Sequence, residues 1–134
     1  MSLSPPAERT LTQLDYVRLT RLLTVAGDAG GMREVLAASD LVASPAVAPS
    51  VATMYSQLLV REATLAAPVK LTLCYPDDAE PARGFISVLS PLGTALLGRR
   101  SGETVHWTAP GGQPRATHIL ELLFQPEATG DYTT

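Results

Sequence analysis

The stretch that decides the fold is SPLGTALLG at residues 90–98. Its first residue, Ser90, is a favoured helix N-cap, and Pro91 suits the first helical position because proline fixes φ near the helical value. At the other end, Gly98 provides the permissive backbone at which many helices stop. These signals predict a short helix from Pro91 to Leu97.

Beyond that helix the apolar period changes to two, which is typical of a strand. Val105 and Trp107 alternate with polar residues, and PGG at residues 110–112 is a turn signal. A second apolar run follows from Ile119 to Phe124. We therefore expect an antiparallel pair of strands directly after the helix.

The first third of the chain has a helical pattern instead. Apolar residues recur at 3.6-residue spacing from Thr12, a candidate cap, to Ala26, and a second apolar stripe begins at Met32. The glycine-rich stretch at residues 27–31 separates the two stripes, because glycine breaks helices and permits a reversal. The pattern predicts a short helical hairpin that ends before Pro45.

Three further strands are predicted between the hairpin and the short helix, at residues 54–60, 69–75 and 84–89. A small antiparallel sheet with one helix packed on it satisfies this order of elements. The fold class is therefore predicted to be α+β. We expect a coiled-coil-like hairpin at residues 1–45 and a sheet domain at residues 46–134.

Composition narrows the class of function. The 134 residues carry a formal net charge of −3 without a concentrated basic patch, so autonomous nucleic-acid binding is disfavoured and a protein partner is expected. The N-terminal residues lack a secretion signal pattern, and no segment approaches the roughly 20 apolar residues that span a bilayer. The lone Cys74 is compatible with a reducing compartment. We expect a cytoplasmic protein without membrane contact.

The sequence offers no clear chemical centre. Gly93 and Gly98 have spacing reminiscent of a phosphate-binding loop, but Arg99 and Arg100 stand where such a loop has lysine and serine or threonine. We expect both glycines to have structural roles. The two histidines and a nearby glutamate are only a weak signal for a metal. We predict no cofactor, no metal site and no catalytic residue.

The residues of the stretch 90–132, including the tail QPEATGDY at residues 125–132, closely resemble the carboxy-terminal domain of the GreA/GreB transcription factors. The resemblance covers residues 49–132 and is strongest to the small family members called regulators of nucleoside diphosphate kinase. It implies an FKBP-like version of the α+β sheet domain. It also implies that the partner is RNA polymerase, which Gre factors grip at the rim of the secondary channel.

In Gre factors the docking contact is the loop that leads into the short helix. By the matched motif, Ser90 and Pro91 are expected to contact the polymerase, and helix capping explains the same pair equally well. Leu89 does not match by identity, since Gre factors can carry an aspartate there. We include Leu89 in the partner-binding set as an apolar residue, which would make the contact more hydrophobic.

Gre factors also insert a long helical hairpin whose acidic tip helps to hold a magnesium ion for transcript cleavage. In this chain a first helix from Thr12 to Ala26 would be only about 22 Å long at 1.5 Å per residue. Its connecting loop offers one carboxylate, Asp28, which we assign to the hairpin tip. Because a divalent ion needs several convergent oxygen ligands, stimulation of cleavage is not expected.

These inferences favour a non-enzymatic transcription regulator that binds RNA polymerase at or near the secondary channel and competes with Gre-type factors. Any contact with DNA would be indirect, through the polymerase. Two alternatives stay open: a direct protein regulator of nucleoside diphosphate kinase, and an FKBP-like prolyl isomerase, for which the fold alone is a weak argument. Self-association through the apolar hairpin also stays open.

Overall fold

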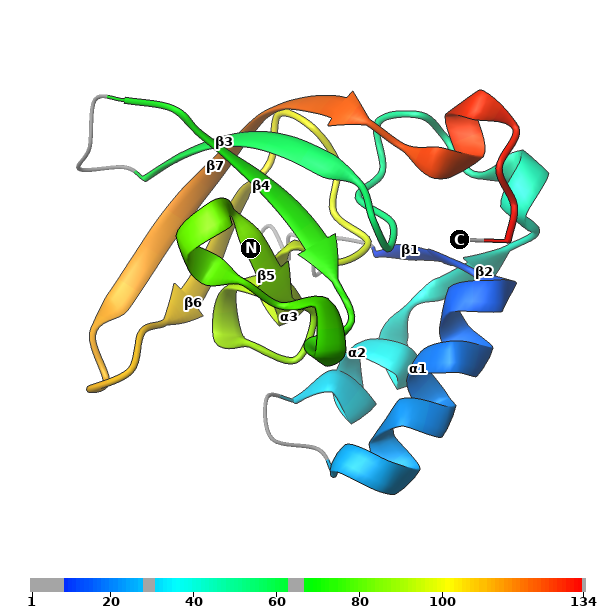
Figure 1. Ribbon diagram of the computed structural model, residues 1–134, viewed down its shortest axis with the longest axis horizontal. Helices are drawn as coiled ribbons and strands as arrows, with labels where there is room; N and C mark the ends of the chain where they lie inside the picture. Colours follow the sequence, from blue (N-terminus) through cyan, green and yellow to red (C-terminus); the bar gives the residue numbers. More distant parts are fainter. Residues whose placement is uncertain (1–8, 28–30, 63–66, 134) are drawn as a thin grey trace, which may run out of the picture.

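The computed structural model describes residues 9–27, 31–62 and 67–133, and Figure 1 shows their arrangement. The described residues form the α-helices α1 (Gln13–Ala26), α2 (Met32–Ala38) and α3 (Pro91–Leu96). They form the strands β1 (Thr10–Thr12), β2 (Asp40–Val42), β3 (Gln57–Glu62), β4 (Val69–Cys74), β5 (Phe85–Ser87), β6 (Thr104–Thr108) and β7 (Pro114–Phe124). Short 3-10 helices are η1 (Ser44–Ala46), η2 (Pro76–Asp78), η3 (Pro81–Arg83) and η4 (Pro126–Thr129). Helices α1 and α2 lie side by side, and the larger sheet curls beside α3 (Figure 1).

The larger sheet has the strand order β5-β4-β3-β7-β6. Strand β3 pairs antiparallel with both β4 and β7, and β6 pairs antiparallel with β7. The predicted α+β class and the strand pair after the short helix are confirmed. The prediction of a wholly antiparallel sheet is wrong at one edge, where β4 and β5 run parallel with Thr72 opposite Phe85. The reason is the connection over residues 75–84, whose two 3-10 helices carry the chain back alongside β4 before it enters β5.

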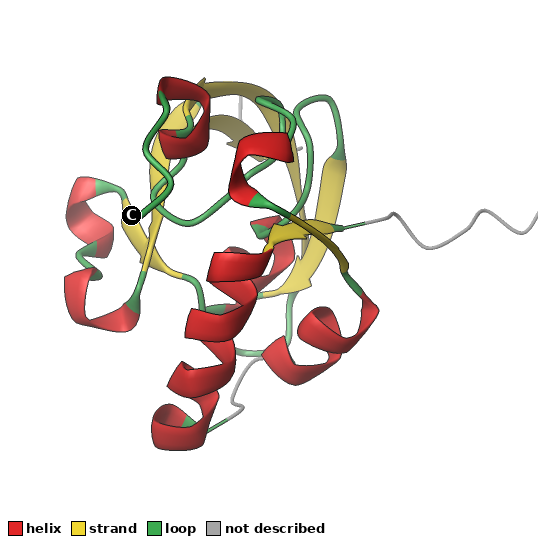
Figure 2. Cartoon of the chain, turned by 90° about the vertical axis from the view of Figure 1, so that its right-hand side faces the viewer, coloured by secondary structure: helices red, strands yellow, loops and turns green. Residues whose placement is uncertain are grey.

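A second sheet of two strands, which the sequence did not predict, closes the base of the helical hairpin. Strands β1 and β2 run parallel and pair Thr10 with Asp40. Strand β1 leads directly into α1, and β2 follows α2, so the pair holds the two ends of the hairpin together (Figure 2). Each strand has three residues, which is too few for an alternating pattern to stand out beside a helix.

The first helix begins and ends where the sequence predicts. The Thr12 hydroxyl accepts a hydrogen bond from the Asp15 backbone N–H at 3.0 Å, and Gly27, with a φ of 79°, follows the last helical residue, Ala26. The predicted tip residue Asp28 lies outside the described residues. Helices α1 and α2 have 14 and 7 residues, so the hairpin is short. Within the described ranges, no helix has the length and apolar character needed to cross a membrane.

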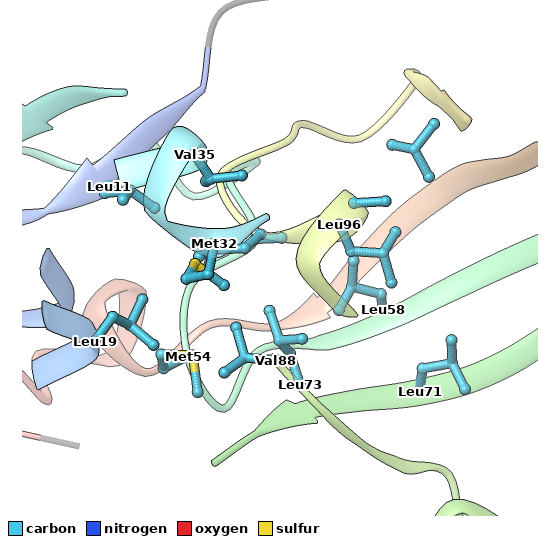
Figure 3. Packing of buried hydrophobic residues seen from close by; sticks show 14 of the residues in the cluster. Leu11, Leu19, Met32, Val35, Met54, Leu58, Leu71, Leu73, Val88 and Leu96 are labelled. Carbon is cyan, nitrogen blue, oxygen red and sulfur yellow. The ribbon is translucent and has the colours of Figure 1, made fainter. Parts of the chain in front are cut away.

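One hydrophobic core joins the hairpin to the sheet (Figure 3). Leu19 of α1 and Met32 of α2 belong to the same buried cluster as three residues of the later elements, which are Leu58 of β3, Leu73 of β4 and Leu96 of α3. Complete burial of a side chain of this size contributes about 2 kcal/mol. The predicted boundary near residue 45 therefore separates two stretches of chain that share a core.

A buried carboxylate also ties the hairpin to the sheet. Asp15 is 1% exposed, and its Oδ2 atom accepts a hydrogen bond from the Met54 backbone N–H at 3.2 Å. Its Oδ1 atom has no hydrogen-bond partner among the residues that the structure describes. Burial raises the pKa of Asp15 to about 6, while the Met54 N–H lowers it and the nearby Glu127 carboxylate raises it. The attachment of α1 therefore includes a group whose charge is costly to bury.

Asp15 should make the stability of the protein depend on pH. Its pKa of about 6 lies above its ordinary value of 3.8, so between these values the folded protein binds a proton more readily than the unfolded chain. This contribution to stability is present in full below about pH 4 and is lost as the pH rises through about 6, with a total near 3 kcal/mol. Urea unfolding across this pH range measures it.

Asp15→Asn is the matched variant, because it keeps an acceptor for the Met54 N–H and does not ionise. The free energy of unfolding of the variant should rise relative to that of the wild type between about pH 4 and about pH 6. Stability curves that stay parallel across this range would show that Asp15 does not titrate as assigned.

Candidate docking site

Hydrogen bonds of Ser90 close the loop before α3. Its hydroxyl donates to the Ser87 carbonyl oxygen at 2.7 Å and accepts from the Gly93 backbone N–H at 3.1 Å. The second bond is an N-cap, because the Ser90 backbone is extended and the helix begins at Pro91. The capping role that the sequence predicts for Ser90 is confirmed, and α3 ends one residue before the predicted Leu97.

Gly93 allows this loop to fold tightly against the helix. A Cβ atom at position 93 would lie 2.0 Å from the Ser87 carbonyl oxygen, so any larger residue would force the loop open. The Thr94 hydroxyl adds a hydrogen bond to the Val88 carbonyl oxygen at 2.8 Å. These contacts fix the shape of the segment that carries the predicted binding residues.

The three predicted partner-binding residues lie together at the start of α3 but differ in exposure. Pro91 is exposed, whereas Leu89 and Ser90 are half-buried. Leu89 packs against the hydrophobic core, and the Ser90 hydroxyl is engaged in the cap. Pro91 is therefore the member of the set that is best placed to meet a partner.

A cleft of about 490 Å³ opens beside Pro91, and the sequence did not predict it. Its lining includes Arg9, before β1, together with Glu34 of α2, Ala95 of α3 and Trp107 of β6. The Trp107 indole is held by a hydrogen bond from Nε1 to the Thr117 hydroxyl at 2.9 Å. Because these elements are far apart in the chain, no local sequence pattern brings them together.

The residues of the weak metal signal do not gather into a site in the part of the chain that is described. There, no group of three or more His, Cys, Asp or Glu side chains could hold a metal ion. His118 shares a hydrogen bond with the Thr104 hydroxyl, at 2.9 Å between Nδ1 and Oγ1. At the end of η2, Asp78 accepts a hydrogen bond from the Tyr55 hydroxyl. These side chains are engaged in contacts within the fold.

Residues 47–123 match the family model described as the C-terminal part of the transcription elongation factors GreA and GreB. The chain belongs to the GreA/GreB family. The matched residues include the loop at residues 89–91 and all of α3. The resemblance that the sequence shows to this family is therefore confirmed.

Curated relatives of this GreA/GreB family member match over part of their length. The chain is 42% identical over 82 residues to the protein named Regulator of nucleoside diphosphate kinase from Escherichia coli (strain K12), which covers 61% of this chain and 60% of that protein. It is 52% identical over 62 residues to Transcription elongation factor GreA of Solidesulfovibrio magneticus, which covers 46% of this chain and 38% of that protein. Each match spans less than two thirds of the relative.

A solved structure extends the similarity beyond the matched domain. The chain is 32% identical to the prokaryotic transcription elongation factor GreA/GreB from Nitrosomonas europaea, with a TM-score of 0.73 over 87% of this chain and 100% of that chain. This coverage exceeds residues 47–123, so the similarity of fold includes part of the N-terminal region.

Ser90→Ala should lower the free energy of unfolding by about 1–2 kcal/mol, because it removes an N-cap and leaves the Gly93 N–H without its acceptor. Ser90→Thr keeps a hydroxyl and serves as the control, which should stay closer to the wild type. Urea unfolding at one pH compares the three proteins. An alanine variant as stable as the wild type would rule out a capping contribution from Ser90.

Proposed function

We propose that this protein is a non-enzymatic transcription regulator that binds RNA polymerase at or near the secondary channel and competes there with Gre-type factors. The observation that carries the proposal is the family match over residues 47–123, which includes the loop at residues 89–91. Relatives with matching sequence are named as elongation factors or as a regulator rather than as catalysts. DNA would be contacted only through the polymerase.

Pro91 is expected to be the outermost contact. It is exposed, and the cap formed by Ser90 holds the backbone beneath it. A residue that is already rigid loses little conformational entropy when a partner binds, so it is a favourable anchor. Leu89 would add apolar surface beside it, and the adjoining cleft offers room for a side chain of the polymerase.

The hairpin supports binding without transcript cleavage. Helix α1 has 14 residues, which corresponds to about 21 Å, and α2 has half as many. Asp15 is buried against the Met54 N–H and is not available to a metal ion. Asp28 alone, the acid assigned to the tip, would not supply the several oxygen ligands that a divalent ion needs. A hairpin of this length suits an element that occupies the mouth of the channel.

Gel filtration tests the proposal. The protein mixed with core RNA polymerase should elute with the polymerase, and an excess of a Gre factor should displace it. Independent elution at micromolar concentrations would refute the proposal.

Direct regulation of nucleoside diphosphate kinase is a second candidate, favoured by the name of the Escherichia coli relative. A pull-down with the purified kinase in the absence of polymerase tests it. A stable complex with the kinase, together with no complex with polymerase, would favour this candidate over the first.

Pro91→Ala should weaken binding to core polymerase about tenfold, because a rigid exposed anchor is lost while the cap at Ser90 remains. The matched control is Pro81→Ala, since Pro81 is also exposed and also begins a short helix, η3. Titrations followed by fluorescence anisotropy measure both affinities. Equal affinities of the two variants would exclude Pro91 from the contact.

Transcript cleavage in a stalled elongation complex should stay at its unstimulated rate when this protein is added, because the hairpin is short. A parallel reaction with a Gre factor is the positive control. Preincubation with an excess of this protein should slow the cleavage that the Gre factor stimulates. Stimulation by the protein alone would be incompatible with the proposed role.

A further inference from the structure

Arg9 holds the C-terminal end of α3. Its Nη1 atom donates hydrogen bonds to the Thr94 carbonyl oxygen at 2.5 Å and to the Leu97 carbonyl oxygen at 3.1 Å. In a longer helix the Thr94 carbonyl would accept from the Gly98 backbone N–H, but that group donates to the Ala52 carbonyl oxygen at 2.8 Å instead. The guanidinium therefore supplies a partner to carbonyl groups that the end of the helix leaves free.

The charge of Arg9 strengthens this contact. The side chain is half-buried, and burial lowers its pKa to about 10, with Arg99 acting in the same direction and Glu103 in the opposite one. The guanidinium is still protonated at neutral pH, so its bonds to the carbonyl oxygens are charge-assisted. A positive group at this position also complements the negative end of the helix dipole.

The same residue belongs to the base of the helical hairpin. The Arg9 carbonyl oxygen accepts a hydrogen bond from the N–H of Asp40, in β2, at 2.9 Å. The next residue, Thr10 in β1, donates its N–H to the Gly98 carbonyl oxygen at 3.1 Å. Gly98 has a φ of 77°, and a Cβ atom there would lie 3.0 Å from the Thr10 carbonyl oxygen. The hairpin base and the end of α3 are therefore in direct backbone contact, and the Arg9 side chain reinforces it.

Arg9 also lines the cleft beside the docking loop. The other residues around it include Glu34 and Val35 of α2 and Pro91 and Thr94 of α3. Because α2 and α3 both line the cleft, a change in their relative position would change its shape. Arg9 therefore bonds to the helix whose first residue, Pro91, is the predicted partner contact, and both residues line the same cleft.

Resting on the proposed function, we infer that Arg9 is a positioning residue that fixes α3 against the hairpin base, so that residues 89–91 and α2 present one rigid surface to the polymerase. Arg9 acts through α3 and does not itself need to touch the partner. Its loss would leave the cap at Ser90 and the backbone bonds of Gly98 in place but would remove the side-chain bonds to the other end of the helix. Binding would then have to order α3 and the hairpin relative to each other, which weakens affinity.

Hydrogen exchange and polymerase affinity of the full chain together test this inference. Arg9→Ala should speed exchange of the Leu97 amide, which bonds to the Gly93 carbonyl oxygen, about tenfold while the β3 amides change little. Its affinity for core polymerase should fall about tenfold. Arg9→Lys keeps a positively charged donor without the fixed geometry of the guanidinium, and should lie between Arg9→Ala and the wild type. The control is Arg83→Ala, an exposed arginine paired with Glu80, which should change neither quantity.

Several results would overturn the positioning role. One is an exchange rate of the Leu97 amide that matches the wild type in both Arg9 variants. A second is an exchange rate that rises by the same factor for the Leu97 amide and for the β3 amides. Another is faster exchange at Leu97 with unchanged polymerase affinity, since the position of α3 would then not matter for binding. The exchange measurement needs no polymerase. A wild-type protein that fails to bind polymerase would therefore refute the proposed function, and exchange would still decide whether Arg9 holds α3.

Discussion

The short helix α3 is fixed by close backbone approach at both of its ends. At its start, Gly93 leaves room for the Ser87 carbonyl oxygen, which would be only 2.0 Å from a Cβ atom. Just past its end, Gly98 lies against Thr10, in the strand that begins the hairpin. The predicted binding loop is at the first contact and the hairpin base is at the second. The 6 residues of α3 therefore set the spacing between the loop and the hairpin.

The hairpin is part of the folded body through two kinds of contact. Leu19 and Met32 contribute apolar surface to the core that the sheet and α3 also share. Asp15 adds a hydrogen bond from the Met54 N–H, at the cost of burying a carboxylate. These contacts give the hairpin a defined orientation relative to the sheet. The proposed role, in which the hairpin occupies the mouth of the channel, requires such a fixed orientation.

Local signals in the sequence predicted the elements that position the site, because caps and turns act over a few residues. Ser90 predicted the start of α3, and Thr12 predicted the start of α1. The close approach of the Ser87 carbonyl oxygen explains the structural role that was expected for Gly93. Contacts between distant segments carry no such signal. Arg9 bonds to Thr94 across 85 residues, and the parallel strand β5 depends on a crossover connection. The cleft is likewise lined by residues from distant parts of the chain. The contribution of residues 89–91 to binding stays a prediction.

The loop before α3 is the surface proposed to meet RNA polymerase, and site-specific crosslinking tests this most directly. A photoreactive amino acid at position 91 should crosslink to core polymerase on irradiation, and an excess of a Gre factor should abolish the product. The same probe at position 69 should not crosslink, because Val69 is 50% exposed but lies at the far end of β4 from the pair of Cys74 with Ser87. No crosslink from position 91, or equal crosslinking from both positions, would contradict the claim.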